Sequence, residues 1–141
     1  MKIRFMKIML DEGAYMPEKA HSSDAGYDLR AVGDRIIPAG ASALIDTGVH
    51  FQIPEGYCGE LISKSGLNCK HDITSTGLID AGYTGSVKVK LYNHGQKPYQ
   101  VYDGDKISQI IFYKIESPDL EIVEAFEQTD RGDNGFGSSG R

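Results

Sequence analysis

The strongest constraint on the fold of this chain is a two-residue alternation of apolar and polar side chains. In the segment GSVKVKLYN, Val87, Val89 and Leu91 alternate with two lysines. Successive side chains of a strand point to opposite faces of a sheet, so this period predicts a strand with one buried face. Segment 49–53 has the same period and ends at Pro54, within a Pro-Glu-Gly turn signal.

Further short strands are expected along the rest of the chain. We predict them at residues 3–10, 35–37, 43–46, 57–63, 106–114 and 121–125, separated by glycine- and proline-rich turns. No window predicts an amphipathic helix of about ten residues. With 17 glycines and many short strands, the expected class is all-β, a jelly-roll-like β-barrel or sandwich. Residues 1–130 are expected to form one β domain, and residues 131–141 a flexible glycine-rich C-terminal arm.

Composition excludes several classes of partner. A formal net charge of -5 without a Lys/Arg run argues against a nucleic-acid partner. The apolar stretches are short, and the start MKIRFMKIML alternates charged with apolar side chains, so we expect no membrane segment, no signal peptide and a cytoplasmic location. Cys58 and Cys69 lack metal-ligand spacing and are expected to be buried or inert thiols. The four histidines are scattered and are expected to be surface or structural residues.

The tail RGDNGFGSSGR is unusual because it places one aromatic residue between glycines. Glycines let backbone N–H groups approach an anion, Arg131 can donate a planar fork of hydrogen bonds to phosphate, and Phe136 offers a face for a base. These are the parts of a nucleotide clasp. A plain disordered tail is the alternative from composition, and an adhesion tripeptide at residues 131–133 is a second.

Two other segments could contact phosphate or metal. LISKSGLNCK carries Lys64, Ser65 and Gly66 after a strand, where hydroxyl, ammonium and N–H groups could converge on phosphate. Ser65 could equally be a plain helix N-cap, and a Ser-Lys nucleophile would lack an evident base. Asp24 and Asp28 could flank a turn before a strand or assist a magnesium ion.

The order of the segments is more informative than any one of them. DAGYDLRA (24–31), SKSGL (63–67), TGLIDAGYTGSVKVKLYN (76–93), GDKISQIIF (104–112) and RGDNGFGSSG (131–140) resemble the five ordered motifs of the trimeric dUTPase family. The resemblance implies a jelly-roll homotrimer with active sites at subunit interfaces. It also implies hydrolysis of dUTP to dUMP and pyrophosphate, which lowers dUTP and supplies dUMP for thymidylate synthesis.

The resemblance also implies roles for individual residues. Asp80 would orient and polarise the water that attacks the α-phosphorus, and Tyr83 would pack on the deoxyribose and exclude a 2'-hydroxyl. The hairpin from about residue 74 to residue 91 would hold uracil through main-chain groups. Within this hairpin the substrate-binding residues would be Thr74, Gly77, Ile79 and Lys90.

The remaining motifs would hold the triphosphate. Lys64 stands where many relatives have Arg, which keeps the charge but loses the fork. The phosphate oxygens would be bound by Lys64, Ser65, Gly66, Gln109, Arg131, Ser138 and Ser139, while Phe136 and Gly137 would cover the uracil. Mg2+ would be held mainly by the triphosphate, with Asp28 as an outer-shell carboxylate acting through water.

Two other functions fit the same resemblance. A dCTP deaminase shares the fold, but those relatives have a Glu ten residues after the turn Asp, and this chain has Lys90 there. A nucleotide-binding or regulatory trimer without catalysis is the second alternative. A jelly-roll coat or scaffold protein without a ligand leaves the five ordered motifs unexplained.

Overall fold

The computed structural model describes residues 3–137 and residue 140, and its regular structure is almost entirely antiparallel strand. In chain order the elements are β1 Lys7–Leu10, β2 Tyr27–Arg30, β3 Arg35–Ile37, β4 Ser42–Asp46, β5 Val49–Gln52, β6 Tyr57–Ile62, α1 Ser65–His71, β7 Ile73–Ile79, β8 Lys88–Asn93, β9 Tyr99–Val101 and β10 Lys106–Lys114. The all-β prediction is therefore confirmed.

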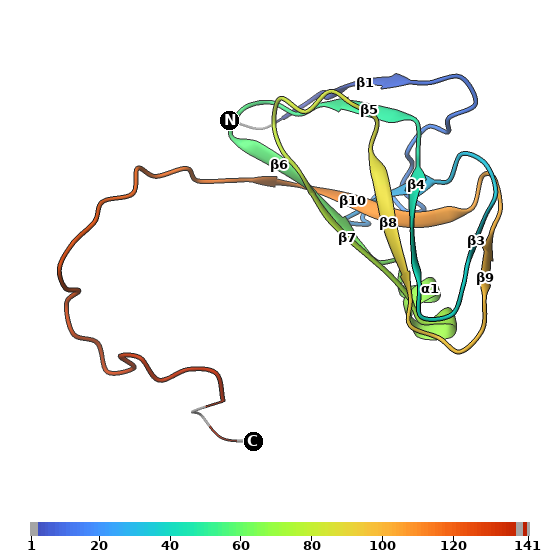
Figure 1. The fold of residues 1–141 in the computed structure, drawn as a ribbon. Helices are drawn as coiled ribbons and strands as arrows, with labels where there is room; N and C mark the ends of the chain where they lie inside the picture. The colour runs from blue at the N-terminus through green and yellow to red at the C-terminus, as the bar shows by residue number, and fades with distance from the viewer. Residues whose placement is uncertain (1–2, 138–139, 141) are drawn as a thin grey trace.

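The largest sheet has six strands in the order β2-β10-β6-β7-β8-β4. It curls around the core as a half-barrel, with the pair β1-β5 along one side and the pair β3-β9 at another (Figure 1). β6 and β7 are adjacent antiparallel strands, and the short helix α1 lies between them in the chain. This connection places α1 at the start of β7 and the turn 80–86 at its end.

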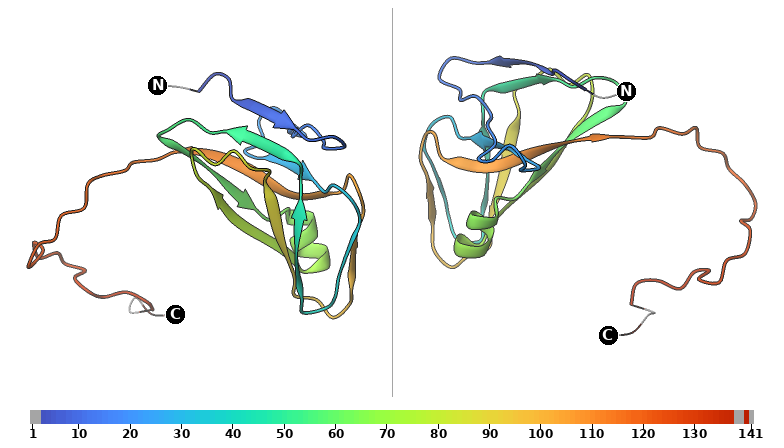
Figure 2. Two further views of the ribbon diagram at one scale, coloured as in Figure 1. Left: turned by 45° about the horizontal axis from the view of Figure 1, so that its top comes forward. Right: turned by 180° about the vertical axis from the view of Figure 1, so that it is seen from behind.

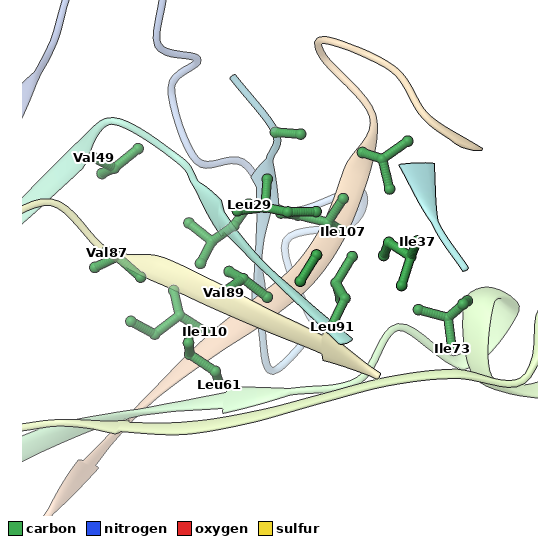
Figure 3. Packing of buried hydrophobic residues seen from close by; sticks show 14 of the residues in the cluster. Leu29, Ile37, Val49, Leu61, Ile73, Val87, Val89, Leu91, Ile107 and Ile110 are labelled. Carbon is green, nitrogen blue, oxygen red and sulfur yellow. The ribbon is translucent and has the colours of Figure 1, made fainter. Parts of the chain in front are cut away.

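The predicted alternation forms the core. Val87, Val89 and Leu91 are buried, whereas Lys88 and Lys90 are exposed on the outer face. Apolar side chains from the six-stranded sheet and both two-stranded sheets meet in one cluster (Figure 3). Removal of this apolar surface from water is the main driving force that closes the strands on one another.

Some boundaries differ from the sequence prediction. β3 and β10 have the predicted bounds, whereas β1 begins only at Lys7. The periodicity of β7 is obscured because its inward positions include Ser75 and Gly77, while the apolar Leu78 points outward. Only the resemblance places residues 74–91 in a hairpin, and β9 lies outside every predicted strand.

The strand predicted at residues 121–125 is wrong. The described chain leaves the sheets after Lys114 and extends away from them (Figures 1 and 2). The side chains of Leu120 and Ile122 are 95% and 100% exposed, so they pack on none of the sheets in the described part of the chain. A strand needs a pairing partner, which local sequence does not supply.

Cys58 is buried as predicted, whereas Cys69 on α1 is exposed. Cys69 is exposed because all of α1 lies on the surface without a buried residue, so for Cys69 the prediction that remains is an inert thiol. No described helix is long and apolar enough to cross a membrane.

Candidate active site

A buried carboxylate and two lysines form the first part of the site. Asp28 on β2 is only 6% exposed, and its carboxylate makes an ion pair with Lys64 and a second, at 3.3 Å, with Lys106 on β10. A buried charge is tolerated when it is paired, and here two ammonium groups surround one carboxylate. The cluster Asp28–Lys64–Lys106 therefore has a net positive charge.

Gln109 lies directly opposite Asp28 in the pairing of β10 with β2. Its Nε2 donates a hydrogen bond of 3.1 Å to the Ser63 carbonyl, at the end of β6. A Cβ built on Gly26 would lie 2.5 Å from Gln109 Oε1, so a glycine leaves room for this side chain. The structure thus brings Gln109 next to Asp28 and Lys64, although they are far apart in the sequence.

Serine hydroxyl groups hold the strand ends beneath this cluster. Ser63 Oγ donates to the Ser75 carbonyl and accepts from the Ser75 N–H, at 3.1 and 2.8 Å. The buried hydroxyl groups of Ser75 and Ser108 are 2.7 Å apart, and Ser108 donates to the Ile62 carbonyl. Together these bonds join β6, β7 and β10 at the point where the chain enters α1.

Ser65 and Gly66 form the exposed first residues of α1. The N-cap is Lys64 in extended geometry, without a side-chain capping bond, so the alternative that Ser65 is the N-cap is wrong. The first N–H groups of any helix have no intrahelical acceptor. Ser65 and Gly66 therefore present free donors beside Lys64.

The predicted uracil-binding residues lie along the hairpin of β7 and β8. The hydroxyl of Thr74 is 2.7 Å from His94 Nε2, and Gly77 pairs with Leu61 of β6. Ile79 is half-buried at the end of β7, and Lys90 is exposed on β8 opposite Thr76. The hairpin is thus continuous with the core but keeps an accessible side.

The turn that follows β7 holds Asp80 and Tyr83, both exposed. The N–H of Tyr83 donates to the Asp80 carbonyl at 3.3 Å, and the hydroxyl of Tyr83 donates to the Ser86 carbonyl at 2.9 Å. A Cβ built on Gly85 would lie 2.5 Å from Tyr83 Oη. Gly85 therefore permits the ring of Tyr83 to fold back over the turn.

The predicted arm residues lie away from the rest of the site in this chain. Arg131 Nε donates to the Asn134 carbonyl at 2.8 Å, and Phe136 is fully exposed. Phe136 has φ +51 and Gly137 has φ +96, so this segment turns through left-handed geometry. Ser138 and Ser139 lie outside the described residues. Figure 2 shows the arm projecting from the sheets in both views.

No group of three or more His, Cys, Asp or Glu side chains that could hold a metal gathers within the described residues. Asp28 is the carboxylate beside the predicted phosphate ligands, and both of its oxygens already have ammonium partners. This donor set does not fit a cage made of protein side chains. It fits an ion held by phosphate oxygens and water, with a single carboxylate nearby.

Comparison with known proteins decides the family. The family model described as dUTPase matches residues 12–140, most of the 141-residue chain. The chain belongs to the dUTPase family. The deoxyuridine 5'-triphosphate nucleotidohydrolase of Candida glabrata is 40% identical over 139 residues, covering 96% of this chain and 96% of the relative.

Two solved dUTPases are similar in structure as well. The dUTPase of Staphylococcus bacteriophage 80alpha, solved with dUpNHpp, has a TM-score of 0.93 and 32% identity and covers 99% of this chain and 100% of its own. A mutant dUTPase from phage phi11 of S. aureus, with a structural Mg(II) ion, has a TM-score of 0.83 and 32% identity and covers 89% and 100%. Both support the dUTPase fold assigned to this chain.

The sequence did not single out three residues in or beside this candidate site. Lys106 is a second counter-ion of Asp28, Gly26 makes room for Gln109, and His50 contacts the turn after Asp80. Each depends on a pairing between distant strands. Their signals in the sequence are weak, because Gly26 and Lys106 lie within ordered motifs without standing out there, and His50 is one of four scattered histidines.

Proposed function

We infer that this chain hydrolyses dUTP to dUMP and pyrophosphate. The observation that carries the inference is the dUTPase match over residues 12–140, which includes an exposed carboxylate at the tip of the β7–β8 hairpin. The reaction lowers dUTP and supplies dUMP for thymidylate synthesis.

In the proposed mechanism Asp80 orients and polarises the attacking water. Water is a weak nucleophile at neutral pH, so a fixed carboxylate within hydrogen-bond reach assists both its deprotonation and its placement. β7 fixes the backbone that enters the turn, because Ile79 pairs with Gly59 of β6. The negative charge of Asp80 is then held at the α-phosphorus by backbone geometry.

Tyr83 excludes ribonucleotides in this proposal. Its ring is folded over Gly85 and its hydroxyl is bound to the Ser86 carbonyl, so the ring has a defined position. The ring packs on the deoxyribose and leaves no space for a 2'-hydroxyl. Of the hairpin residues predicted to hold uracil, Gly77, Ile79 and Lys90 lie toward the turn with Asp80, whereas Thr74 lies six strand residues, about 20 Å, from Asp80. Uracil is therefore held by backbone groups at the turn end of the hairpin, and cytosine would leave those groups unpaired.

The phosphate oxygens are bound by Lys64, Ser65, Gly66 and Gln109. Lys64 has a compact positive charge whose partner, Asp28, is also paired with Lys106. Lys106 can therefore keep Asp28 neutralised while Lys64 turns toward phosphate. This arrangement offers the triphosphate a cation without leaving a buried charge unpaired.

Magnesium is the proposed cofactor, bound chiefly by the three phosphates, with Asp28 reached through water. Bound in this way, Mg2+ neutralises phosphate charge and favours departure of pyrophosphate. Asp28 would contact the ion through its bound water, and the lysines paired with Asp28 would limit direct coordination by its carboxylate.

We propose that the active site is shared between chains of a homotrimer. Ser63 contacts Ser75 near the start of β7, whereas Asp80 follows the end of β7. The five residues from Ser75 to Asp80, at ~3.3 Å each, separate the phosphate ligands from Asp80 by about 16 Å. One triphosphate cannot place its α-phosphorus at Asp80 and its outer oxygens at Lys64 and Gln109 of the same chain.

The arm supports the same assembly. Leu120, Ile122 and Phe126 are at least 90% exposed in the isolated chain. Several exposed apolar residues in one short segment are typical of an interaction surface. On a neighbouring chain the arm would be anchored, and Arg131, Phe136, Gly137, Ser138 and Ser139 would then close over the nucleotide. A cytoplasmic location stays a prediction from the sequence.

Turnover of four nucleotides tests the proposed reaction. We expect pyrophosphate release from dUTP, and far less from dCTP, dTTP and UTP. Asp80→Asn should lower kcat on dUTP by about 10²–10⁴-fold because the base is lost. Its melting temperature should stay near that of the wild type, since Asp80 is exposed. Ammonia release from dCTP would instead favour the deaminase, and binding of dUTP without turnover the regulatory trimer.

Mixed trimers test the shared site. Asp80→Asn and Gln109→Ala chains, each inactive alone, are unfolded together in equal amounts and refolded. If Asp80 and Gln109 of one site come from different chains, about one quarter of the sites will receive both intact residues. Recovery of about a quarter of wild-type activity is expected. If both residues of a site came from the same chain, no site would be intact and no activity would return.

A further inference from the structure

A histidine joins the turn that holds Tyr83 to the body of the domain. His50 lies in β5, and its side chain is 19% exposed. Its Nδ1 is 2.7 Å from the Thr84 carbonyl, and its Nε2 is 2.8 Å from Asp11 Oδ1. The ring therefore bridges two segments that are distant in the sequence.

Both ends of this bridge are fixed by the fold. His50 is flanked in β5 by the buried residues Val49 and Phe51. The N–H of Asp11 donates to the Gly48 carbonyl at 2.8 Å, directly after the pairing of β1 with β5 ends. Gly48 has φ +64, and a Cβ on it would lie 2.8 Å from Ala14 Cβ, so a glycine allows this close approach. The Asp11 carboxylate is thus placed by backbone contacts.

The chemistry of the bridge requires two donors on the ring. A backbone carbonyl and a carboxylate are both acceptors, and only the protonated imidazole has an N–H on each nitrogen. The Thr84 carbonyl and then the Asp11 carboxylate hold the pKa of His50 above its ordinary value, and Asp46 acts in the same direction. Lys7 on β1 lines a surface pocket together with His50 and Thr84, and it is the cation beside the bridge.

The bound carbonyl belongs to the loop that Tyr83 closes. The hydroxyl of Tyr83 returns to the Ser86 carbonyl, so side chain and backbone form a ring over residues 83–86. Thr84 is one of the residues in this ring, and its carbonyl is bound by His50, which lies outside the ring. After the turn, the N–H of Val87 donates to the Val49 carbonyl, next to His50. His50 and Val49 together attach the turn to β5.

We propose that His50 is a positioning residue that fixes the Tyr83 turn and thereby sets the discrimination between deoxyribose and ribose nucleotides. The proposal rests on the proposed function of Tyr83. The protonated ring holds both acceptors. When pH rises through the raised pKa, one ring nitrogen loses its proton and faces an acceptor without a donor. The turn then loosens and the ribose is excluded less strictly.

Two variants test whether protonation of His50 holds the turn. His50→Gln keeps one N–H donor but cannot titrate. Asp11→Asn keeps an acceptor for Nε2 but removes the negative charge that favours the imidazolium. His21→Gln is the matched control, because His21 is exposed and lies outside the residues assigned to the site.

The readout is the ratio of kcat/KM for dUTP to kcat/KM for UTP between pH 6 and pH 9. In the wild type and in His21→Gln we expect the ratio to fall about tenfold as pH rises, the size of one lost hydrogen bond to a charged group. In Asp11→Asn the same fall should occur at lower pH. In His50→Gln the ratio should be lower at pH 6 and independent of pH.

A second readout does not depend on turnover. The NMR shift of the Gly85 amide should titrate with the pKa of the His50 ring in the wild type, and should not titrate in His50→Gln. If the NMR shift of the Gly85 amide does not follow the titration of His50, His50 does not position the turn, whether or not the enzyme is active. A wild-type ratio that is constant with pH overturns the link to discrimination. Absence of any dUTP turnover would contradict the proposed function alone.

Discussion

At the scale of single residues, Gly85 determines where the ring of Tyr83 can lie. The ring folds back toward the backbone of its own turn, and its hydroxyl reaches the Ser86 carbonyl. Any side chain at residue 85 would begin with a Cβ 2.5 Å from Tyr83 Oη. This is closer than non-bonded atoms approach in packed proteins, so the ring would have to move.

We therefore expect Gly85→Ala to weaken discrimination between dUTP and UTP. The displaced ring would reopen space near the 2'-carbon, and the ratio of the two kcat/KM values should fall by about tenfold or more. Steady-state kinetics on both nucleotides measures this ratio. Tyr83→Phe serves as the comparison, because it keeps the ring and loses only the bond to Ser86. An unchanged ratio in Gly85→Ala would show that the ring of Tyr83 does not exclude the 2'-hydroxyl.

At the scale of elements, β2, β6 and β10 each contribute to one charged cluster. β2 provides Asp28, the end of β6 leads to Lys64, and β10 provides Lys106. Antiparallel pairing of β10 with both neighbours brings these residues together. If Lys64 binds phosphate as proposed, the cluster links the stability of the sheet edge to phosphate binding, because the same lysine serves both.

Lys106→Met should raise the KM for dUTP about three- to tenfold, with a smaller change in kcat. Without Lys106, Lys64 becomes the remaining counter-ion of a buried carboxylate, and moving it to phosphate leaves Asp28 unpaired. Steady-state kinetics with a melting curve separates this effect from misfolding. Lys88→Met, which changes an exposed lysine on β8, is the control. An equal KM for dUTP in both variants would contradict the proposal that Lys106 keeps Asp28 paired while Lys64 binds phosphate.

A second link between elements predicts how stability depends on pH. Tyr15 Oη donates to Asp103 Oδ2 at 2.7 Å, and the N–H of Gly33 donates to Asp103 Oδ1. The bond from Tyr15 and then that from Gly33 lower the pKa of Asp103 below its ordinary value, and the pKa of Tyr15 is raised chiefly by the same bond. The contacts join the loop after β1 to the turn between β9 and β10.

The sign follows from these two directions. Asp103 contributes stability that is present above its unfolded pKa of about 3.9 and is lost as pH falls through the lowered folded value. Tyr15 contributes stability that is present below about pH 10 and is lost as pH rises through the raised value. Urea unfolding of wild type and Tyr15→Phe should therefore differ by a constant amount between about pH 5 and pH 9. If the difference in unfolding free energy between the two proteins grew as pH fell below about 4, the predicted lowering of the Asp103 pKa would be contradicted.

At the scale of the whole molecule, the chain leaves apolar surface without a partner. The arm is extended after Lys114, and Leu120, Ile122 and Phe126 have no core to join within the described chain. In addition, Asp80 and the predicted phosphate ligands of one chain are too far apart along β7 to bind the same triphosphate. In the proposed homotrimer, neighbouring copies would satisfy both features, so assembly would complete the packing and the site together.

Two truncations should separate assembly from closure. A chain that ends at residue 130 keeps the exposed apolar residues, so we expect it to remain a trimer while turnover falls by at least about 100-fold, as for loss of a closing segment. A chain that ends at residue 114 loses the apolar arm and should dissociate. Light scattering gives the mass, and pyrophosphate release gives the turnover. Full activity in the first truncation would refute the clasp.

Several properties follow from the sequence alone because they depend on local periodicity. The alternation at residues 87–91 is enough to predict β8 and its buried face, and turn residues between short strands are enough to predict an all-β fold. The ordered motifs place Asp80, Tyr83, Gln109 and Asp28 among the candidate residues through resemblance. Local pattern fails at residues 121–125, where an apolar segment has no strand to pair with in the described chain.

Only the tertiary structure decided which residues meet. Three features all arise from strand order and register: the pairing of Asp28 with Lys64 and Lys106, the bridge from His50 to Thr84, and the distance along β7 between Asp80 and the predicted phosphate ligands. Strand order is fixed by burial of the whole apolar cluster at once, not by any single segment. Local periodicity therefore determines the strands of this dUTPase-family chain, and cooperative packing determines its site.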